Sequence, residues 1–270
     1  MYAGEARRLQ TVLQPLAGVD AVRQATRRVL RSLEDLTDAQ ASEPSRLPDW
    51  SRAELITHLA RNADGIRGMA EAAARGEVAA QYPGGFEQRA QDIAAGKGER
   101  AASLRADLRG AHDRLVDAWL ALPPDAWDRV GRGAVERTMR EFVWVRWREV
   151  EIHHLDLDLG FEASDWPVGF VSGALDEIFT TFPLRATSTR PLVDATYRVV
   201  STDHEKQWDV ELRGEHVSVT SRADGSADGE AHGWGCDIAA WLYGRDPRGG
   251  GVVASGDLGV LRLPQWFPFA

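Results

Sequence analysis

One stretch of the sequence, residues 138–159, most constrains what this chain can fold into. It contains neither glycine nor proline. Its apolar residues recur at near-helical intervals, at Phe142, Val145, Trp147, Val150, Ile152, Leu155 and Leu159. Because this period is that of an α-helix, the stretch is predicted to be helical. Glu149 and His153 then lie one turn apart on the same face of that helix.

The pair of Glu149 and His153 indicates a metal site. A carboxylate and an imidazole at this spacing can hold one metal ion between them, and a third ligand must come from elsewhere in the fold. His58, in the second turn of another predicted helix, is the natural candidate. A histidine on a helix is usually structural or solvated, and a Glu–His pair is often a simple surface pair. The apolar neighbours of Glu149 favour the metal site, because burying an unpaired carboxylate is expensive.

Charge and cysteine content exclude several classes of function. The formal net charge is −9, from 41 acidic against 32 basic residues, which argues against a nucleic-acid binder. Cys236 is the single cysteine, so no internal disulfide can form and the chain suits a reducing cytoplasm. There is no apolar run of membrane-spanning length, and the first ten residues lack the apolar core expected of a signal peptide. We therefore expect a cytoplasmic protein that contacts neither nucleic acid nor membrane.

The first part of the chain is predicted to form a four-helix bundle. Long helices are expected at 19–36, from Trp50 to about Arg75, from Glu99 to Leu120, and at 138–159. A short helix holds Arg89, and the segment Asp128–Val135 is predicted to be a loop. Polar groups that project inward from two helices are typical of a bundle with an interior metal site.

The character of the sequence changes after residue 165. A helix is expected at 168–182, followed by alternating, strand-like segments at Leu192–Val200, Gln207–Leu212 and His216–Thr220. A loop at 224–235, a helix at about Asp237–Tyr243 and a last strand in the C-terminal stretch complete this part. The predicted fold class is α+β, with a bundle at 1–165 and a smaller α+β domain at 166–270.

Several blocks of the sequence resemble a known family. They read SRLPDWSRAELITHLARNADGIRGM (45–69), YPGGFEQRAQDI (82–93), RWREVEIHHLDLDLG (146–160), and GWGCDIAAWLYGRD with LRLPQWFPF near the C-terminus. Together they closely resemble the mycothiol-dependent maleylpyruvate isomerase family, and the resemblance covers nearly the whole chain. That family pairs a DinB-like four-helix metal-binding domain with a smaller C-terminal α+β domain. This chain departs from the pattern in carrying His154 directly after His153 and in its Gly84-Gly85-Phe86 turn.

The resemblance implies a site and its ligands. His58, Glu149 and His153 match the ligands of a divalent metal, expected to be zinc, whose remaining position takes the thiol of mycothiol. Arg89 and Arg245 match arginines that act on substrate or cofactor. Without the resemblance, Arg89 would be an ordinary surface residue and Arg245 a cation that stabilises a helix C-terminus. The expected partners are a small-molecule thiol and a small anionic substrate, with the protein a monomer or homodimer.

Residues beside the predicted ligands receive separate interpretations. Asp156 lies one turn from His153 and is the better candidate, before Asp158, for accepting the second N–H of that imidazole. Glu151 points away from the site and is expected to be solvated. His154 is expected either to contact a metal ligand without binding the metal itself or to lie on the surface. Cys236, which has no place in the family pattern, is interpreted as buried filler.

The function implied by the resemblance is a metal- and mycothiol-dependent cis–trans isomerisation. The thiolate would add to the cis double bond of an activated enoate such as maleylpyruvate, rotation would follow, and elimination would return the trans isomer. Two alternatives stay open at this point. One is a mycothiol S-transferase that acts on an electrophile, and the other is a non-enzymatic metal-binding DinB-like protein.

Overall fold

The computed structural model describes residues 15–187, 190–221, 225–245 and 251–269. The described part of the chain divides into two compact units, one ending at Phe161 and the other beginning at Glu162. The sequence predicted a boundary after residue 165, and the division falls after Phe161.

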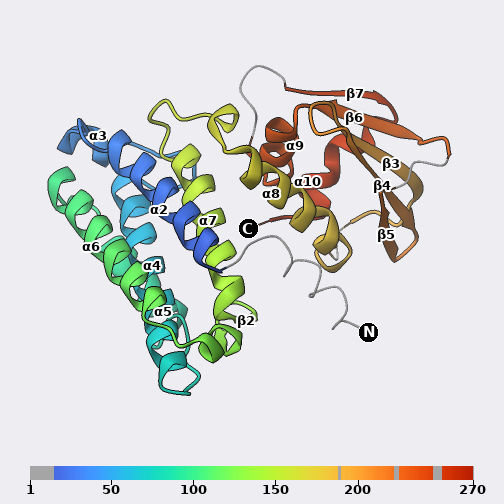
Figure 1. Ribbon diagram of the computed structural model, residues 1–270. Helices are drawn as coiled ribbons and strands as arrows, with labels where there is room; N and C mark the ends of the chain where they lie inside the picture. The colour runs from blue at the N-terminus through green and yellow to red at the C-terminus, as the bar shows by residue number, and fades with distance from the viewer. Residues whose placement is uncertain (1–14, 188–189, 222–224, 246–250, 270) are drawn as a thin grey trace. The chain divides into compact units, whose positions relative to one another are not determined.

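The first unit is a bundle of long helices that lie side by side (Figure 1). Those in its described part are α2 (Pro15–Ser32), α4 (Arg52–Ala74), α6 (Ala101–Leu120) and α7 (Met139–Asp156). The shorter elements α3 (Asp38–Ser42), α5 (Gly85–Ala94) and η1 (Pro124–Asp128) lie between them in the chain. The helices bury apolar residues against one another, including Val22, Val29, Leu55, Ile66, Leu108, Leu115 and Phe142. Burial of this apolar surface is the main force that holds the bundle together.

Capping residues fix where the two site-bearing helices begin. Ser51 is the N-cap of α4: its hydroxyl accepts from the amide of Glu54, and the Glu54 carboxylate accepts from the amide of Ser51 at 2.9 Å. Thr138 and Glu141 form the same capping box at the start of α7. The second helix was predicted to begin at Trp50, which is wrong, because this reciprocal pair of bonds sets the start at Arg52.

The first helix lies four residues earlier in the chain than predicted: the expectation was 19–36, and α2 is Pro15–Ser32. A proline suits the first turn of a helix, because its missing N–H is not needed there. Leu33 continues the buried apolar period and made the predicted helix too long. At this end Arg105 donates to the carbonyls of Leu33 and Glu34, at 3.2 and 2.6 Å, and so holds the chain where α2 stops.

The segment predicted to be a loop before α7 contains a short hairpin. β1 (Val130–Arg132) pairs with β2 (Glu136–Thr138) in antiparallel register. Gly131 leaves room for two methionines, because an added Cβ would lie 2.7 Å from side-chain atoms of Met69 and Met139 and would displace them. The hairpin also exchanges backbone bonds with residues 79–81, which lead into α5. It therefore ties together the starts of α5 and α7, the helices that carry Arg89 and Glu149.

The second unit packs helices on a mixed sheet (Figure 1). In its described residues the strand order is β5-β4-β3-β6-β7, and only the β3–β6 pair is parallel. The strands are β3 (Asp194–Ser201), β4 (Lys206–Arg213), β5 (His216–Thr220), β6 (Gly229–Gly233) and β7 (Val252–Gly256). The helical elements are η2 (Ala163–Asp165), α8 (Val168–Thr181), η3 (Phe182–Leu184), α9 (Gly235–Leu242), η4 (Leu258–Arg262) and α10 (Leu263–Trp266). Phe179 of α8 stacks on Trp208 of β4, with ring centroids 4.2 Å apart.

Two predictions for this unit are wrong. The expected loop at 224–235 contains β6, a strand whose glycines hide it from a propensity argument. Gly229 lets β6 approach the backbone of Asp257 more closely than any side chain would permit. The expected last strand is the helical pair η4 and α10, and β7 precedes it.

The predicted α+β class is confirmed by a helical bundle followed by a mixed sheet with its own helices. None of the helices in the described ranges combines the length and the apolar character needed to cross a lipid bilayer.

Candidate metal centre

Three side chains from two helices converge in the bundle. His58 comes from α4, and Glu149 and His153 come from α7; one ligand atom from each lies within 4.8 Å of the others. Glu149 Oε2 is 3.1 Å from His58 Nε2 and 3.7 Å from His153 Nε2. The structure thus brings together the three residues that were predicted as metal ligands.

The second nitrogen of each imidazole already has a partner. His153 Nδ1 lies 2.9 Å from Asp156 Oδ2, so its Nε2 is left facing Glu149. This is the contact expected of Asp156, while Asp158 pairs with Arg46 at 3.1 Å. His58 Nδ1 lies 3.1 Å from the guanidinium of Arg89. The Asp156 contact fixes the ring of His153 and leaves its Nε2 available to a metal. Arg89 can only donate, so its contact holds the ring of His58 in place through the lone pair of Nδ1.

The protonation states suit a cation. Burial lowers the pKa of His58 to about 4, so this imidazole is neutral at neutral pH. Burial alone would raise the pKa of Glu149, but the hydrogen bond from His58 and the electrostatic interactions with His153 and Arg148 outweigh it and hold this pKa well below its usual range. Metals bind neutral imidazoles and ionised carboxylates. Two imidazoles and one carboxylate are a common catalytic zinc set that leaves a fourth position open. These residues therefore fit a divalent metal.

A buried network behind Glu149 was missed by sequence reasoning. Arg146 is fully buried and donates to Asn62 Oδ1 at 2.8 Å and to the carbonyl of Leu59 at 2.9 Å. Asn62 Nδ2 in turn lies 3.4 Å from Glu149 Oε2. Burial lowers the pKa of Arg146 to about 10, and the charge of Glu149 opposes that shift. Helical spacing offered a signal, since Arg146 lies three residues before Glu149 and Asn62 four after His58.

The site is closed on the His58 side and more open at Glu149. The Trp50 ring stands edge-on to His58, with centroids 5.5 Å apart. The side chain of His58 is 5% exposed, against 14% for His153 and 23% for Glu149. An incoming ligand would therefore approach over the carboxylate and His153.

Of the two predicted arginines, Arg89 contacts a candidate ligand and Arg245 belongs to the other unit. Arg89 of α5 reaches the site through its contact with His58, and its guanidinium also lies 5.2 Å from the centroid of the Tyr82 ring. Arg245 follows α9 in the other unit, where it donates to the carbonyl of Tyr243 at 2.7 Å. Its part in the site stays a prediction.

Comparison with known proteins places the bundle in a family. A family model described as the mycothiol maleylpyruvate isomerase N-terminal domain matches residues 22–158, about half of the chain. The chain belongs to this family. All three candidate ligands and Arg89 lie within the matched range, and Arg245 lies outside it. A search of curated proteins gave no match.

Solved structures of the mycothiol-dependent maleylpyruvate isomerase share the fold of this family member. One crystal structure is 24% identical, covers 90% of this chain and 93% of its own, and superposes with a TM-score of 0.75. A variant of that enzyme in which a histidine is replaced by alanine matches with the same values. Because the match runs over both units, the fold likeness extends beyond the family domain.

Two residues of this family member lie elsewhere than predicted. Glu151, expected to be solvated, is fully buried, pairs with Arg28 and accepts from Trp147 Nε1 at 2.8 Å. His154 is also buried, 2.8 Å from Ser32 Oγ. The physical reason is that α7 packs against α2 on one face and α4 on another, so it has no broad solvated side.

Cys236 of α9 is buried, and burial raises the pKa of its thiol. A thiol with a raised pKa is less often ionised and therefore less reactive. Its surroundings are those expected of a residue that fills space.

Proposed function

We propose that this protein is a metal- and mycothiol-dependent isomerase that converts an activated cis-enoate of the maleylpyruvate type into its trans isomer. The observation that carries the proposal is the convergence of His58, Glu149 and His153 within 4.8 Å. It lies inside a domain of the mycothiol maleylpyruvate isomerase family. The solved enzyme with the same fold is a mycothiol-dependent maleylpyruvate isomerase by its title.

His58, Glu149 and His153 would hold the divalent metal. A metal held there would bind the mycothiol thiol as its thiolate, the nucleophile whose reversible addition to the double bond permits rotation and elimination. One carboxylate and two neutral imidazoles leave net positive charge at a divalent ion, which favours the thiolate over the thiol.

The residues around the ligands hold them in position for this task. Asp156 fixes the ring of His153 through Nδ1. Asn62 and Arg146 approach Glu149 from the bundle interior and favour its ionised form. Because these partners come from helices, the three ligand atoms are preorganised.

Arg89 would bind a carboxylate of the substrate. Its planar guanidinium can form two parallel hydrogen bonds to a carboxylate and can also stabilise the enolate charge that develops during addition. Arg89 is positioned for this because its guanidinium already lies beside the His58 ring. Arg245 is proposed as a second substrate or cofactor arginine on the strength of the family resemblance.

The test is a titration of the zinc-loaded full-length protein with mycothiol, followed by an isomerisation assay on maleylpyruvate. His153→Ala is the site variant. His216→Ala is the matched control, because His216 is exposed on β5. We expect thiol binding that requires zinc, isomerisation by the native protein and the control, and loss of both in His153→Ala.

The other outcomes separate the alternatives. Metal-dependent thiol binding without isomerisation, together with turnover of a non-isomerisable electrophile, would select the S-transferase. Zinc binding without thiol binding would leave a non-enzymatic metal-binding protein. Full activity in His153→Ala would contradict the site itself.

A further inference from the structure

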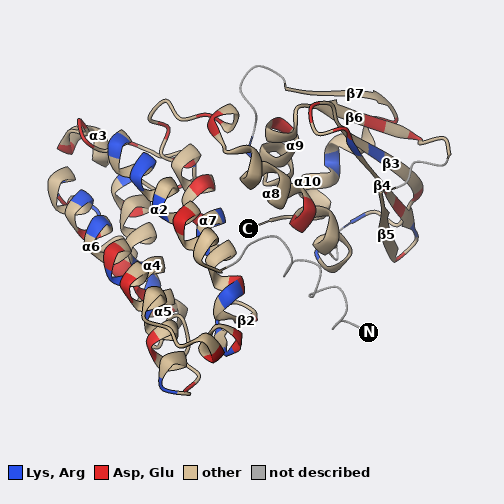
Figure 2. Cartoon of the chain, in the orientation of Figure 1, with Lys and Arg blue, Asp and Glu red and all other residues tan. Residues whose placement is uncertain are grey.

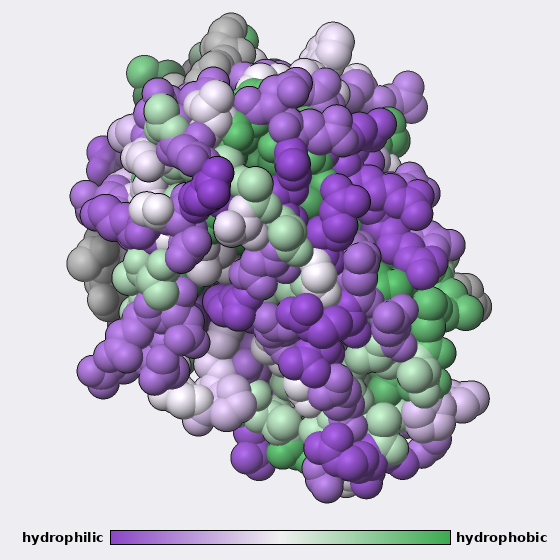
Figure 3. Space-filling model, turned by 90° about the vertical axis from the view of Figure 1, so that its left-hand side faces the viewer, coloured by the Kyte–Doolittle hydropathy of each residue, from purple (hydrophilic) through white to green (hydrophobic). Residues whose placement is uncertain are grey.

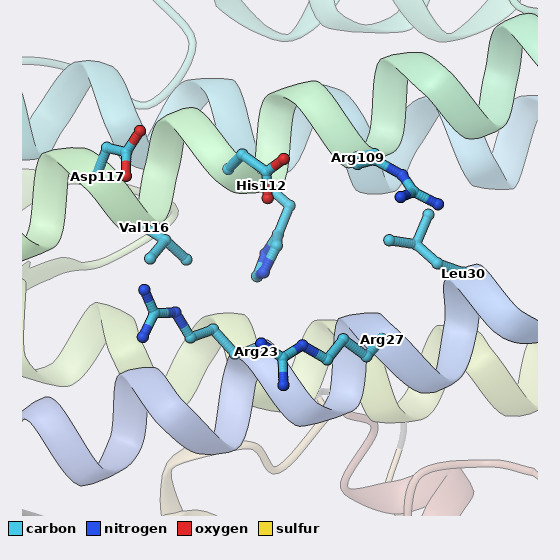
Figure 4. Close-up of a pocket in the computed structure, with 8 residues that line it drawn as sticks. Arg23, Arg27, Leu30, Arg109, His112, Val116 and Asp117 are labelled. Carbon is cyan, nitrogen blue, oxygen red and sulfur yellow. The ribbon is translucent and has the colours of Figure 1, made fainter.

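A pocket opens in the bundle, between α2 and α6, and none of the candidate metal ligands lines it. Its volume is about 530 Å³, which is within the usual range of small-molecule sites. The charged and polar residues of its lining are Arg23, Arg27, Arg109, His112, Asp113 and Asp117. Figure 4 shows Arg23 and Arg27 extending from α2, and Arg109 and His112 from α6, around one space.

The arginines of this pocket have few partners in the protein. Arg27 and Arg109 make no hydrogen bond or ion pair with any residue that the structure describes, and both are exposed. Arg23 pairs only with Asp20, at 3.3 Å, among the described residues. Elsewhere on the bundle surface arginines are matched with acidic neighbours, as Arg61 is with Asp107. The guanidinium groups of Arg27 and Arg109 are therefore available to an anion from outside.

The same positive region continues into a neighbouring hollow. This hollow has a volume of about 480 Å³ and shares Arg27 and Arg109 with the pocket. Arg31 adds a further positive charge to its lining, which also includes Glu34 and Arg28, the partner of Glu151. Figure 2 shows basic residues on α2 and on α6 in a chain whose net charge is −9. The local charge therefore opposes that of the chain as a whole, which favours capture of an anion.

His112 adds a hydrogen-bond donor to the pocket. Its ring is 6% exposed and points from α6 across the space toward α2 (Figure 4). Its Nδ1 is buried without a hydrogen-bond partner among the described residues. A buried N–H without an acceptor costs more than a bare lone pair, so the proton of the neutral ring belongs on Nε2. The remaining nitrogen then presents an N–H to the pocket.

The charge state of His112 agrees with this role. Burial lowers its pKa to about 3, and the charges of Arg146, Arg23 and Arg27 act in the same direction. The ring is therefore a neutral donor at physiological pH, and the positive charge of the pocket comes from the arginines alone.

We propose that this pocket binds a small phosphorylated metabolite. A phosphate group presents three oxygens with several acceptor sites, enough for more than one guanidinium and an imidazole N–H, whereas one bidentate arginine satisfies a carboxylate. Asp113 and Asp117 would accept from hydroxyl groups on the rest of the molecule. The face of the protein that carries α6 is mostly hydrophilic (Figure 3), which suits a polar ligand.

The test is calorimetry on the metal-free, full-length protein with inorganic phosphate and glucose 6-phosphate as probes. The site variant is Arg27→Gln with Arg109→Gln, and both residues are exposed, so folding should be kept. The control is Arg75→Gln with Arg100→Gln, which removes the same charge outside the pocket. We expect binding of both probes, at least tenfold weaker binding to the site variant, and less than twofold change in the control.

Succinate and glucose complete the design. Succinate should bind at least tenfold more weakly than glucose 6-phosphate, and glucose should not bind. The proposal is overturned if neither phosphate probe binds, if the control loses as much affinity as the site variant, or if succinate binds as tightly. The site variant should keep full isomerase activity, so this proposal and the proposed function can fail separately.

Discussion

Helix α7 carries two pairs of glutamate and histidine whose surroundings differ. Glu149 and His153 face α4, and their side chains are 23% and 14% exposed. Glu151 and His154 face α2 and are 0% and 1% exposed. The residue types are the same and the spacing is nearly so, yet only the first pair forms a candidate metal site.

The difference lies in the partners that the fold already supplies. Glu151 is held by Arg28 of α2 and by Trp147 of its own helix. His154 Nε2 lies 2.8 Å from Ser32 Oγ, and the ring stacks on Phe161 with ring centroids 3.7 Å apart. Glu149 and His153 instead turn their ligand atoms toward each other and toward His58. Metal binding on this helix is therefore decided by whether the ligand atoms converge on one point, not by residue type.

The most severe test of this comparison removes one histidine from each pair. His153→Ala should weaken zinc binding on the order of a thousandfold, because it deletes a ligand and not merely an outer partner, whose loss costs roughly 10–100-fold. His154→Ala should change zinc affinity less than about threefold and lower stability instead. Competition with a chromophoric chelator measures both. Equal losses in the two variants would mean that the pairs are not functionally distinct.

Replacing the buried glutamate should lower the stability of the protein and leave its zinc affinity unchanged. Glu151→Gln leaves Arg28 without its anion, but burial raises the pKa of Glu151 in spite of Arg28 and Trp147, so the change also removes a desolvation cost. We therefore expect the free energy of unfolding to fall by about 1.5 kcal/mol, the scale of one hydrogen bond to a charged group. Zinc affinity should not change. Urea unfolding of the metal-free protein measures the effect. The double variant with Arg28→Gln should cost less than the sum of the single changes, and strict additivity would argue against the ion pair.

The sequence predicted the helices of the bundle because their signals are local. Apolar residues recur with the helical period, and Ser51 and Thr138 precede a glutamate by three residues in capping boxes. The strands β1, β2, β6 and β7 were missed because they are short or rich in glycine. Their stability comes from pairing with distant residues, such as Ala231 of β6 with Val199 of β3, which no local pattern reports.

The candidate site likewise contains residues that the sequence predicted and residues that it did not. His58, Glu149 and His153 could be named from helical spacing and a family resemblance. Arg146 looked like an ordinary charged residue, and its burial depends on Asn62 and Leu59 of another helix. The burial of Glu151 was missed for a related reason. An amphipathic helix was assumed to have a solvated face, whereas α7 is covered by both α2 and α4.

Asp156 tests the comparison through a smaller expected effect, because it contacts His153 without being one of the candidate ligands. Asp156→Asn keeps the shape but removes the charge that holds His153 Nδ1–H, and zinc affinity should fall by about tenfold. Asp158→Asn is the matched control, since that carboxylate pairs with Arg46 instead. Chelator competition again provides the readout. A larger loss in Asp158→Asn would reverse the assignment.

The buried pair also predicts a pH dependence. Burial lowers the pKa of His154 to about 3, whereas in the unfolded chain it has the ordinary value of about 6.5. The unfolded state therefore binds more protons between these values, and stability falls as pH falls below about 6.5. Between pH 7.5 and 5.5 the native protein should lose about 1.4 kcal/mol more than His154→Gln. Urea unfolding at both pH values measures this, and equal losses would contradict the burial of a neutral ring.

The last prediction concerns Arg89 and the proton on His58. A guanidinium can only donate, so its contact with His58 Nδ1 requires a lone pair there and places the proton of the neutral ring on Nε2, facing Glu149. A metal bound through Nε2 needs that lone pair for itself and leaves the proton on Nδ1, opposite the guanidinium. Metal binding and the contact between Arg89 and His58 therefore exclude each other.

It follows that loading the site with metal releases Arg89, the residue proposed to bind substrate. Arg89→Gln should then bind zinc roughly three- to tenfold more tightly, since one hydrogen bond of about 1 kcal/mol no longer has to be broken, while isomerase activity falls. Arg61→Gln, which removes the same charge from the surface of α4, should change neither. Tighter zinc binding together with lower activity is a combination that general damage to the site would not produce. Unchanged or weaker zinc binding in Arg89→Gln would show that the arginine and the metal occupy His58 together, and that Arg89 is held at the site rather than released by it.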